Sequence, residues 1–235
     1  VYHAAYDIKF MVPEAGIDPY NGGWRALQVV CASTFLALVG VSAWVRDQRL
    51  RARGVTGLAA WRVSAPRGVQ IALGAAAVSL GTFVALGGDD VVRFGILHLI
   101  ALAHLVVLPL VVRFGAWNIV VGVAIVAAGL VLKGTGTGVP ALMVVGLDPG
   151  ETGVDWMPLL PWLGVVLIGV AVGALLYPGG ERHHGLRRLV AAPAWAAAAG
   201  APGRRSLTVY LLHQPVLIAL TAGMLLLVGT TPEGF

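Results

Sequence analysis

The chain has 235 residues, of which 58% are hydrophobic and only 11% are charged, and its mean hydropathy is +0.85. A soluble domain carries about 25% charged residues, so the composition excludes an ordinary soluble enzyme or binding module. Apolar runs of about 20 residues recur along the chain, which is typical of helical membrane proteins, and the short alternating segments of a β-barrel are absent. The formal net charge is +5, but most arginines lie in loops between apolar runs, which argues against nucleic acid as a partner.

The apolar runs predict an all-α, polytopic transmembrane bundle with about seven spans. We expect these spans at residues 1–11, 25–45, 68–87, 94–112, 117–133, 158–177 and 206–228. The first is too short to cross about 30 Å of hydrocarbon, and the chain begins at Val1 without a methionine. We therefore expect helix 1 to be truncated at its start, and residues 1–235 to form a single transmembrane domain.

The charged residues separate into two sides of the predicted bundle. Twelve arginines fall on one side: Arg46, Arg49, Arg51, Arg53, Arg62, Arg67, Arg113, Arg182, Arg187, Arg188, Arg204 and Arg205. The other side has four basic residues (Lys9, Arg25, Arg93 and Lys133) and most of the acids. The positive-inside rule predicts that the arginine-rich loops are cytoplasmic. Together with a composition rich in Arg, Ala, Gly and Val, this favours a multi-pass protein of the bacterial plasma (inner) membrane.

Four histidines lie in apolar segments: His3, His98, His104 and His213. A titratable side chain within a membrane segment indicates a functional site, and the competing interpretation is an interhelical hydrogen bond. The single Cys31 excludes an internal disulfide and a multi-cysteine metal site. No two of these histidines have the i, i+4 spacing of metal ligands on one helix, so no metal is expected.

His3 and Asp7 are four residues apart, which stacks them on one helical face. A carboxylate beside an imidazole can fix its tautomer and raise its basicity, as a general base requires. The alternative is an Asp–His hydrogen bond at a helix end that faces water. His213 lies near the start of the last span, with Tyr210 on nearly the same face and Pro215 interrupting the helical ladder.

His98 lies at the outer start of its predicted helix, close to Gly95, where a backbone or ligand could approach closely. His104 is six residues further on, about 240° around the helix, so we interpret it as a packing residue. The connection 134–157 leads into a segment with two prolines between Trp156 and Trp162. This pattern predicts an irregular start of the next helix that lines a cavity, or alternatively an ordinary aromatic belt.

Four segments together resemble a known family. They are residues 1–7 (VYHAAYD), 92–102 (VRFGILHLIAL), 155–173 (beginning DWMPLLPW) and 203–215 (GRRSLTVYLLHQP). In this order they resemble the bacterial branch of the heparan-alpha-glucosaminide N-acetyltransferase catalytic-domain family, within the transmembrane acyltransferase superfamily. The resemblance covers nearly the whole chain.

The resemblance implies an acyl-CoA-dependent transmembrane acyltransferase. It implies transfer of an acetyl or short acyl group from cytoplasmic acetyl-CoA to an amine or hydroxyl of an extracytoplasmic, sugar-containing acceptor. The expected catalytic residues are His3, Asp7, His98 and His213. Arg204, Arg205 and Tyr210 are expected to bind the coenzyme, because arginine pairs phosphate oxygens in a bidentate manner. Asp155, Trp162 and Gln214 are expected to bind the acceptor.

Two other functions stay open at the level of sequence. The catalytic histidine of the animal enzyme lies in the first outer loop, whereas loop 12–24 of this chain has no histidine. A catalytically silent accessory subunit of a larger membrane complex is therefore one alternative. A proton-linked transporter is another, because intramembrane His and Asp residues suit proton relays, although no internal repeat is visible. Membrane lipids are expected partners, and a homo-oligomer is possible.

Overall fold

The computed structural model describes residues 1–148, 150, 153–185, 200, 203 and 205–229. The described residues form two compact units. Unit 1 consists of residues 1–32 and the described residues from 200 onward, and unit 2 consists of residues 33–185 as far as they are described. All regular elements in these ranges are helical, as the sequence predicts. The expected single domain stays a prediction.

Five described helices are long and apolar enough to cross a membrane, so the predicted count of seven spans is not confirmed. They are α2 (Gly22–Arg51), α3 (Gly57–Leu86), the helical run Ile96–Val131, α7 (Leu159–Leu176) and α11 (Ser206–Leu227). Helix α1 (Tyr2–Met11) has only ten residues, about half of what a span needs. Short 3₁₀ turns lie at Pro13–Ala15, Pro140–Val144 and Pro178–Gly180.

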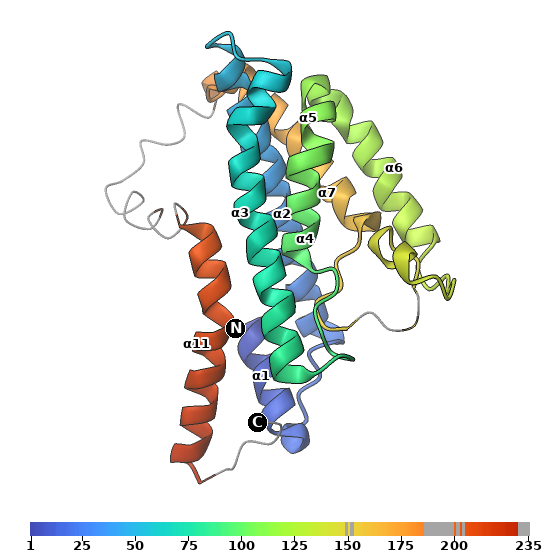
Figure 1. Cartoon of the computed structure of the whole chain (residues 1–235), viewed down its shortest axis with the longest axis vertical. Helices are drawn as coiled ribbons and strands as arrows, with labels where there is room; N and C mark the ends of the chain where they lie inside the picture. Colours follow the sequence, from blue (N-terminus) through green and yellow to red (C-terminus); the bar gives the residue numbers. More distant parts are fainter. Residues whose placement is uncertain (149, 151–152, 186–199, 201–202, 204, 230–235) are drawn as a thin grey trace. The chain divides into compact units, whose positions relative to one another are not determined.

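The run Ile96–Val131 explains the rest of the difference in span number. It consists of α4 (Ile96–Leu102), a π-helical turn (Ala103–Val107), α5 (Leu108–Val111), a 3₁₀ segment (Val112–Trp117) and α6 (Asn118–Val131). Gly115 breaks the run, because its φ of 53° and ψ of −123° are not helical. The chain turns back at this point, and α6 lies beside α7 (Figure 1). Both predicted segments, 94–112 and 117–133, are therefore parts of one helical run.

Helix α7 packs against its neighbours through glycines. A Cβ built on Gly40 of α2 would lie 2.0 Å from the carbonyl oxygen of Val166, and one on Gly169 would lie 2.1 Å from that of Ala37. On the other side of α7, a Cβ on Gly164 would lie 2.4 Å from the carbonyl oxygen of Gly122 in α6. Small residues are typical of membrane helix interfaces because van der Waals contact, rather than the hydrophobic effect, drives association in lipid.

The turn Ala103–Val107 is joined to α3 by a tryptophan. Pro109 has no backbone N–H, so the carbonyl of Leu105, four residues earlier, loses its usual helical partner. The indole Nε1 of Trp61 donates to this carbonyl at 2.9 Å. The hydrogen bond satisfies a polar group that would be costly to leave unpaired in hydrocarbon.

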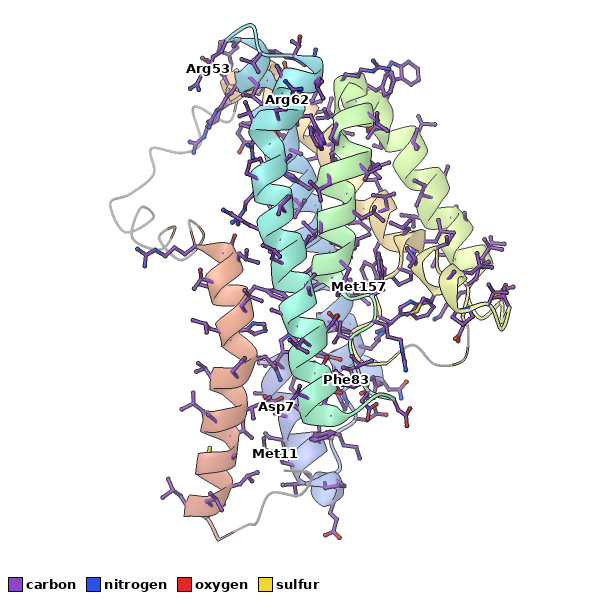
Figure 2. The ribbon with its side chains drawn as sticks, in the orientation of Figure 1. Asp7, Met11, Arg53, Arg62, Phe83 and Met157 are labelled. Carbon is purple, nitrogen blue, oxygen red and sulfur yellow. The ribbon has the colours of Figure 1, made fainter. Side chains whose placement is uncertain are left out.

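The start of α7 is irregular, as the two prolines predict. Pro158 precedes the helix in an extended conformation, and Leu160 has a non-helical ψ of 124°. Trp156 donates from Nε1 to the carbonyl of Met143 at 2.9 Å, which ties the segment to the preceding 3₁₀ turn. Met157 is buried beside it and donates its backbone N–H to Phe94 at 2.9 Å (Figure 2).

Candidate functional site

Unit 1 brings together five of the predicted site residues from the two ends of the chain. His3 and Asp7 belong to α1, and Tyr210, His213 and Gln214 belong to α11. The rings of His3 and His213 meet edge to face, with centroids 4.8 Å apart. The Tyr210 ring lies 5.2 Å from that of His213, as expected for residues three apart on one helix. We call His3, Asp7, Tyr210, His213 and Gln214 the histidine cluster.

Asp7 joins the two helices through a side-chain hydrogen bond. Gln214 donates from Nε2 to Oδ1 of Asp7 at 2.5 Å, and Asp7 is only 4% exposed. Figure 2 shows Asp7 on α1, with Met11 one turn further along. Within the described part of the chain, Oδ2 of Asp7 and Oε1 of Gln214 are buried without a hydrogen-bond partner. These two oxygens lie at one contact between α1 and α11, and both can accept a hydrogen bond from a donor group of a bound molecule.

The contacts of His213 determine which of its two ring nitrogens can accept a proton from a substrate. Nδ1 lies within hydrogen-bond distance of the backbone carbonyl of Tyr210. A carbonyl can only accept, so Nδ1 carries a proton, and in the neutral form of the ring Nε2 has the lone pair. A backbone carbonyl that orients an imidazole through Nδ1 is the arrangement that a general base needs.

The described contacts of Asp7 differ from the sequence prediction in one respect. The i, i+4 spacing predicts that Asp7 orients His3, whereas the described hydrogen bond of Asp7 runs to Gln214 on the other helix. The reason is tertiary. Packing of α11 against α1 brings the side-chain amide of Gln214 to the carboxylate of Asp7. The amide N–H then fills the place at Oδ1 that the sequence assigned to the His3 ring.

The Asp7–Gln214 contact predicts an energetic coupling between α1 and α11. In a double-mutant cycle with Asp7→Ala and Gln214→Ala, we expect a coupling free energy of about 0.5–2 kcal/mol, the range measured for interhelical hydrogen bonds in membranes. Unfolding in mixed micelles measures it. Asp18→Ala paired with Gln214→Ala is the control, because Asp18 is bonded to Tyr20 and Asn21 instead. A coupling no larger than in the control pair would contradict the hydrogen bond.

His98 lies in unit 2, and both of its ring nitrogens have partners there. The backbone N–H of Gly95 donates to Nδ1 at 3.2 Å. Nε2 therefore carries the proton and donates to Oγ of Ser79 at 3.3 Å, and Ser79 donates in turn to the carbonyl of Val92 at 2.5 Å. His98 thus caps α4 and holds the preceding loop. Its catalytic role stays a prediction.

Asp155 lies against the same loop. The residue as a whole is exposed and has a positive φ of 52°, but its carboxyl group is turned toward α4 and accepts from the backbone N–H of Ile96 at 3.3 Å. A Cβ on Gly95 would lie only 2.4 Å from Oδ2, so the close approach expected at Gly95 is made by Asp155. Burial of the carboxyl group raises the pKa of Asp155 to about 6, although the Ile96 hydrogen bond acts in the opposite direction.

This pKa predicts a pH-dependent stability. The unfolded chain ionises Asp155 near the ordinary value of 3.8, whereas the folded protein keeps the proton up to about pH 6. The free energy of unfolding is therefore expected to fall as pH rises from about 4 to about 6. Asp155→Asn should flatten this fall and raise stability at pH 7, since Asn keeps an acceptor and tolerates a positive φ. Thermal unfolding at pH 4.5 and 7.5 measures both effects. An unchanged pH profile in the variant would contradict the assignment.

The remaining predicted residues are dispersed. Trp162 is half-buried near the start of α7 in unit 2. Arg205 is exposed immediately before α11, and Arg204 lies outside the described residues. His104 lies in the π-helical turn. The backbone carbonyl of Ser64 accepts from its ring, and its Nε2 is buried without a partner among the described residues.

Sequence reasoning missed Ser79, the partner of His98. A lone serine in an apolar helix gives no signal of its own, and nineteen residues separate the pair. Among the described residues, no three potential metal-ligating side chains gather.

Comparison with known proteins decides the family. A family model described as heparan-alpha-glucosaminide N-acetyltransferase, catalytic, matches residues 1–215. The chain belongs to this family. The match covers all five members of the histidine cluster, as well as His98, Asp155 and Trp162. Searches of curated proteins and of solved structures found no significant match.

Membership identifies the general type of protein. The family is one of membrane acyltransferases, which agrees with the five apolar helices. Acetyltransferases of this type use acetyl-CoA as the donor. The environment is therefore a lipid bilayer, and the general chemistry of the family is acyl transfer.

Proposed function

We propose that this protein transfers an acetyl or short acyl group from cytoplasmic acyl-CoA to an amine or hydroxyl of an extracytoplasmic, sugar-containing acceptor. The observation that carries the proposal is the histidine cluster of unit 1, in which two imidazoles meet beside a buried carboxylate. We further propose that the protein lies in a bacterial plasma membrane with its arginine-rich loops in the cytoplasm. The distribution of basic residues supports this orientation.

The two imidazoles supply the proton transfers that the reaction requires. His213, with Nδ1 held by the Tyr210 carbonyl, removes a proton from the acceptor at Nε2 while the acceptor attacks the thioester carbonyl. The carbon–sulfur bond then breaks, and the thiolate leaves with the bonding electron pair and takes up a proton. The adjacent His3 donates a hydrogen bond to the carbonyl oxygen as negative charge develops there.

Asp7 and Gln214 have a positioning role in this proposal. Their unpaired buried oxygens accept hydrogen bonds from the acceptor amine or hydroxyl and hold it beside His213. Arg205, together with Arg204, remains our proposal for contacts to coenzyme phosphates. Asp155 and Trp162 remain proposals for the acceptor side, to be tested by substitution.

The test uses the whole chain in lipid nanodiscs. Acetyl-CoA is supplied with a panel of amino sugars and neutral sugars, release of free thiol is followed continuously, and acetylated products are identified by mass spectrometry. We expect thiol release that depends on the acceptor and one acetylated product for each molecule of thiol.

Three other outcomes would overturn the proposal. Coenzyme binding without any acetylated product would indicate a silent accessory subunit, above all if other membrane proteins co-purify. Movement of protons across sealed vesicles without product would indicate a transporter. If calorimetry detects no acetyl-CoA binding to protein that is shown to be folded, acetyl-CoA is excluded as the acyl donor.

A further inference from the structure

The contact between Asp7 and Gln214 in unit 1 leaves two oxygens to be explained. Nε2 of Gln214 donates to Oδ1 of Asp7 at 2.5 Å, whereas Oδ2 of Asp7 and Oε1 of Gln214 are buried with no partner in the part of the chain that the structure describes. An ionised carboxylate and an amide oxygen are both acceptors only, so neither of these oxygens can satisfy the other. A buried acceptor without a donor destabilises the fold, and a charged one does so more strongly.

A single proton on Asp7 gives both oxygens a partner. A protonated carboxyl group has one O–H donor and keeps an acceptor oxygen, which is the donor and acceptor pattern that a primary amide also presents. With the proton on Oδ2, this oxygen donates to Oε1 of Gln214 while Nε2 donates to Oδ1. Two hydrogen bonds then join two planar groups, and they fix the relative orientation of the side chains as one bond does not.

The surroundings of Asp7 favour this neutral form. The residue is 4% exposed, and no lysine or arginine among the described residues forms an ion pair with it. Lys9, the cation on the same helix, donates to the backbone carbonyl of Pro13 instead. Burying a charge without an opposite charge is costly, and a buried carboxyl group takes up a proton rather than bear that cost.

The neighbouring titratable groups are consistent with a neutral Asp7. Helix α1 and the elements packed against it also carry Tyr2, His3, Tyr6, Glu14, Tyr210 and His213. Of these, His213 acts electrostatically on Asp7 across the contact. In its neutral form His213 supplies no cation to the carboxyl group. A neutral Asp7 in turn leaves His213 neutral, whereas a carboxylate at this place would favour the charged imidazolium, which has no lone pair.

We infer that Asp7 binds a proton on Oδ2 and shares it with Oε1 of Gln214, and that this neutral acid–amide pair positions His213 beside His3. The proton comes from the solvent. The pair is the arrangement before an acceptor binds. An acceptor that donates to Oδ2 and Oε1 takes the place of the proton, which returns to the solvent. The inference does not rest on the proposed function, because it concerns only these side chains and their proton.

The first test is infrared difference spectroscopy of the full-length protein in phosphatidylcholine nanodiscs at pH 7. The C=O stretch of a protonated carboxyl group is separate from the bands of carboxylates and amides, and it shifts in D2O. We expect this band in the wild type and its loss in D7N. D18N is the matched control and should keep the band, because Asp18 is an exposed acid of the same unit that is bonded to Tyr20 and Asn21. Any protonated Asp155 is common to all three proteins and cancels in the difference spectra.

The second test measures the unfolding equilibrium in mixed micelles for D7N and D7L. Asparagine presents Oδ1 as an acceptor and an N–H as a donor, so it keeps both hydrogen bonds to Gln214 without a titratable proton. Leucine removes both bonds. At pH 7 we expect D7N to change the unfolding equilibrium constant by less than about threefold and D7L to raise it at least about tenfold. At pH 9 the wild type should approach D7L, whereas D7N should not change.

A third measurement reports the positioning of His213 directly. The rings of His3 and His213 are close enough for an NMR contact between their protons, since their centroids are 4.8 Å apart. We expect this contact to persist in D7N and to be lost in D7L. Rescue by asparagine distinguishes a positioning pair of hydrogen bonds from a role of the carboxylate charge.

Three outcomes would overturn the inference. If the folded wild type lacks the acid band at pH 7, Asp7 is ionised and bound water satisfies the two oxygens. If the band is equally strong in D7N, it belongs to another acid. If D7N destabilises the protein as much as D7L, the charge of the carboxylate and not a shared proton joins α1 to α11. None of these measurements uses acyl-CoA, so a failure of the proposed function leaves them unaffected.

Discussion

His213→Ala is expected to lower the rate of acyl transfer at least about 100-fold, the usual contribution of a positioned general base. The residue is the member of the histidine cluster whose tautomer is set by the backbone, through the Tyr210 carbonyl. Alanine removes the Nε2 lone pair and also the edge-to-face contact with His3. The acceptor would then have to lose its proton to water. Initial rates of thiol release at saturating acetyl-CoA measure the effect.

The controls separate catalysis from folding. His184→Ala changes an exposed histidine of unit 2 and should leave the rate unchanged. His213→Gln keeps a side chain of similar length without a basic nitrogen, so it should be as inactive as the alanine variant. Both His213 variants should bind acetyl-CoA with wild-type affinity, because no coenzyme contact is assigned to that ring. Full activity in His213→Gln would exclude His213 as the base and transfer that role to His3.

Gly40→Ala is expected to lower the free energy of unfolding by about 1–3 kcal/mol, the usual cost of overpacking. A methyl group at position 40 would lie 2.0 Å from the carbonyl oxygen of Val166 and 2.6 Å from the backbone N of Val170. Because both neighbours are backbone atoms of α7, no side-chain rotamer can relieve the clash. The helices α2 and α7 must move apart, which also opens the Gly169–Ala37 contact one row away.

Gly81→Ala is the matched control and should change stability in the opposite direction. Gly81 is a glycine inside α3, and an added methyl group would meet nothing within 4 Å, so alanine should raise helix stability by about 0.5–1 kcal/mol. Unfolding in mixed micelles, followed by circular dichroism, measures both variants. Equal effects at positions 40 and 81 would show that α2 and α7 do not pack backbone to backbone.

The helices were more predictable than their ends. The predicted span 25–45 is part of α2, which extends from Gly22 to Arg51. The predicted span 68–87 lies in α3, which begins at Gly57 and ends at Leu86, except for its last residue. Hydropathy marks the stretch that suits hydrocarbon, whereas a helix continues as long as its backbone hydrogen bonds do. Arg62 and Arg67 lower the mean hydropathy of the first turns of α3, so a hydropathy pattern does not detect that part of the helix.

The candidate residues of the histidine cluster were also visible in the sequence, but their partners were not. An imidazole or carboxylate in an apolar run is conspicuous, which singled out His3, Asp7 and His213. The contact between Asp7 and Gln214 joins residues 207 positions apart, and no local period reports it. The same holds for His98, whose hydrogen-bond partner Ser79 lies nineteen residues earlier on another helix.

The sequence by itself determined that the chain is a helical membrane protein and which polar side chains stand out within it, because burial in lipid is a property of each segment alone. Only the tertiary structure decided that Asp7 bonds to Gln214 and that the carboxyl group of Asp155 bonds to the start of α4. Both contacts join residues far apart in the sequence, and so does the close approach of α2 and α7 at Gly40 and Gly169. Which helices approach one another depends on how their surfaces pack, which is a property of pairs of segments and not of any one segment.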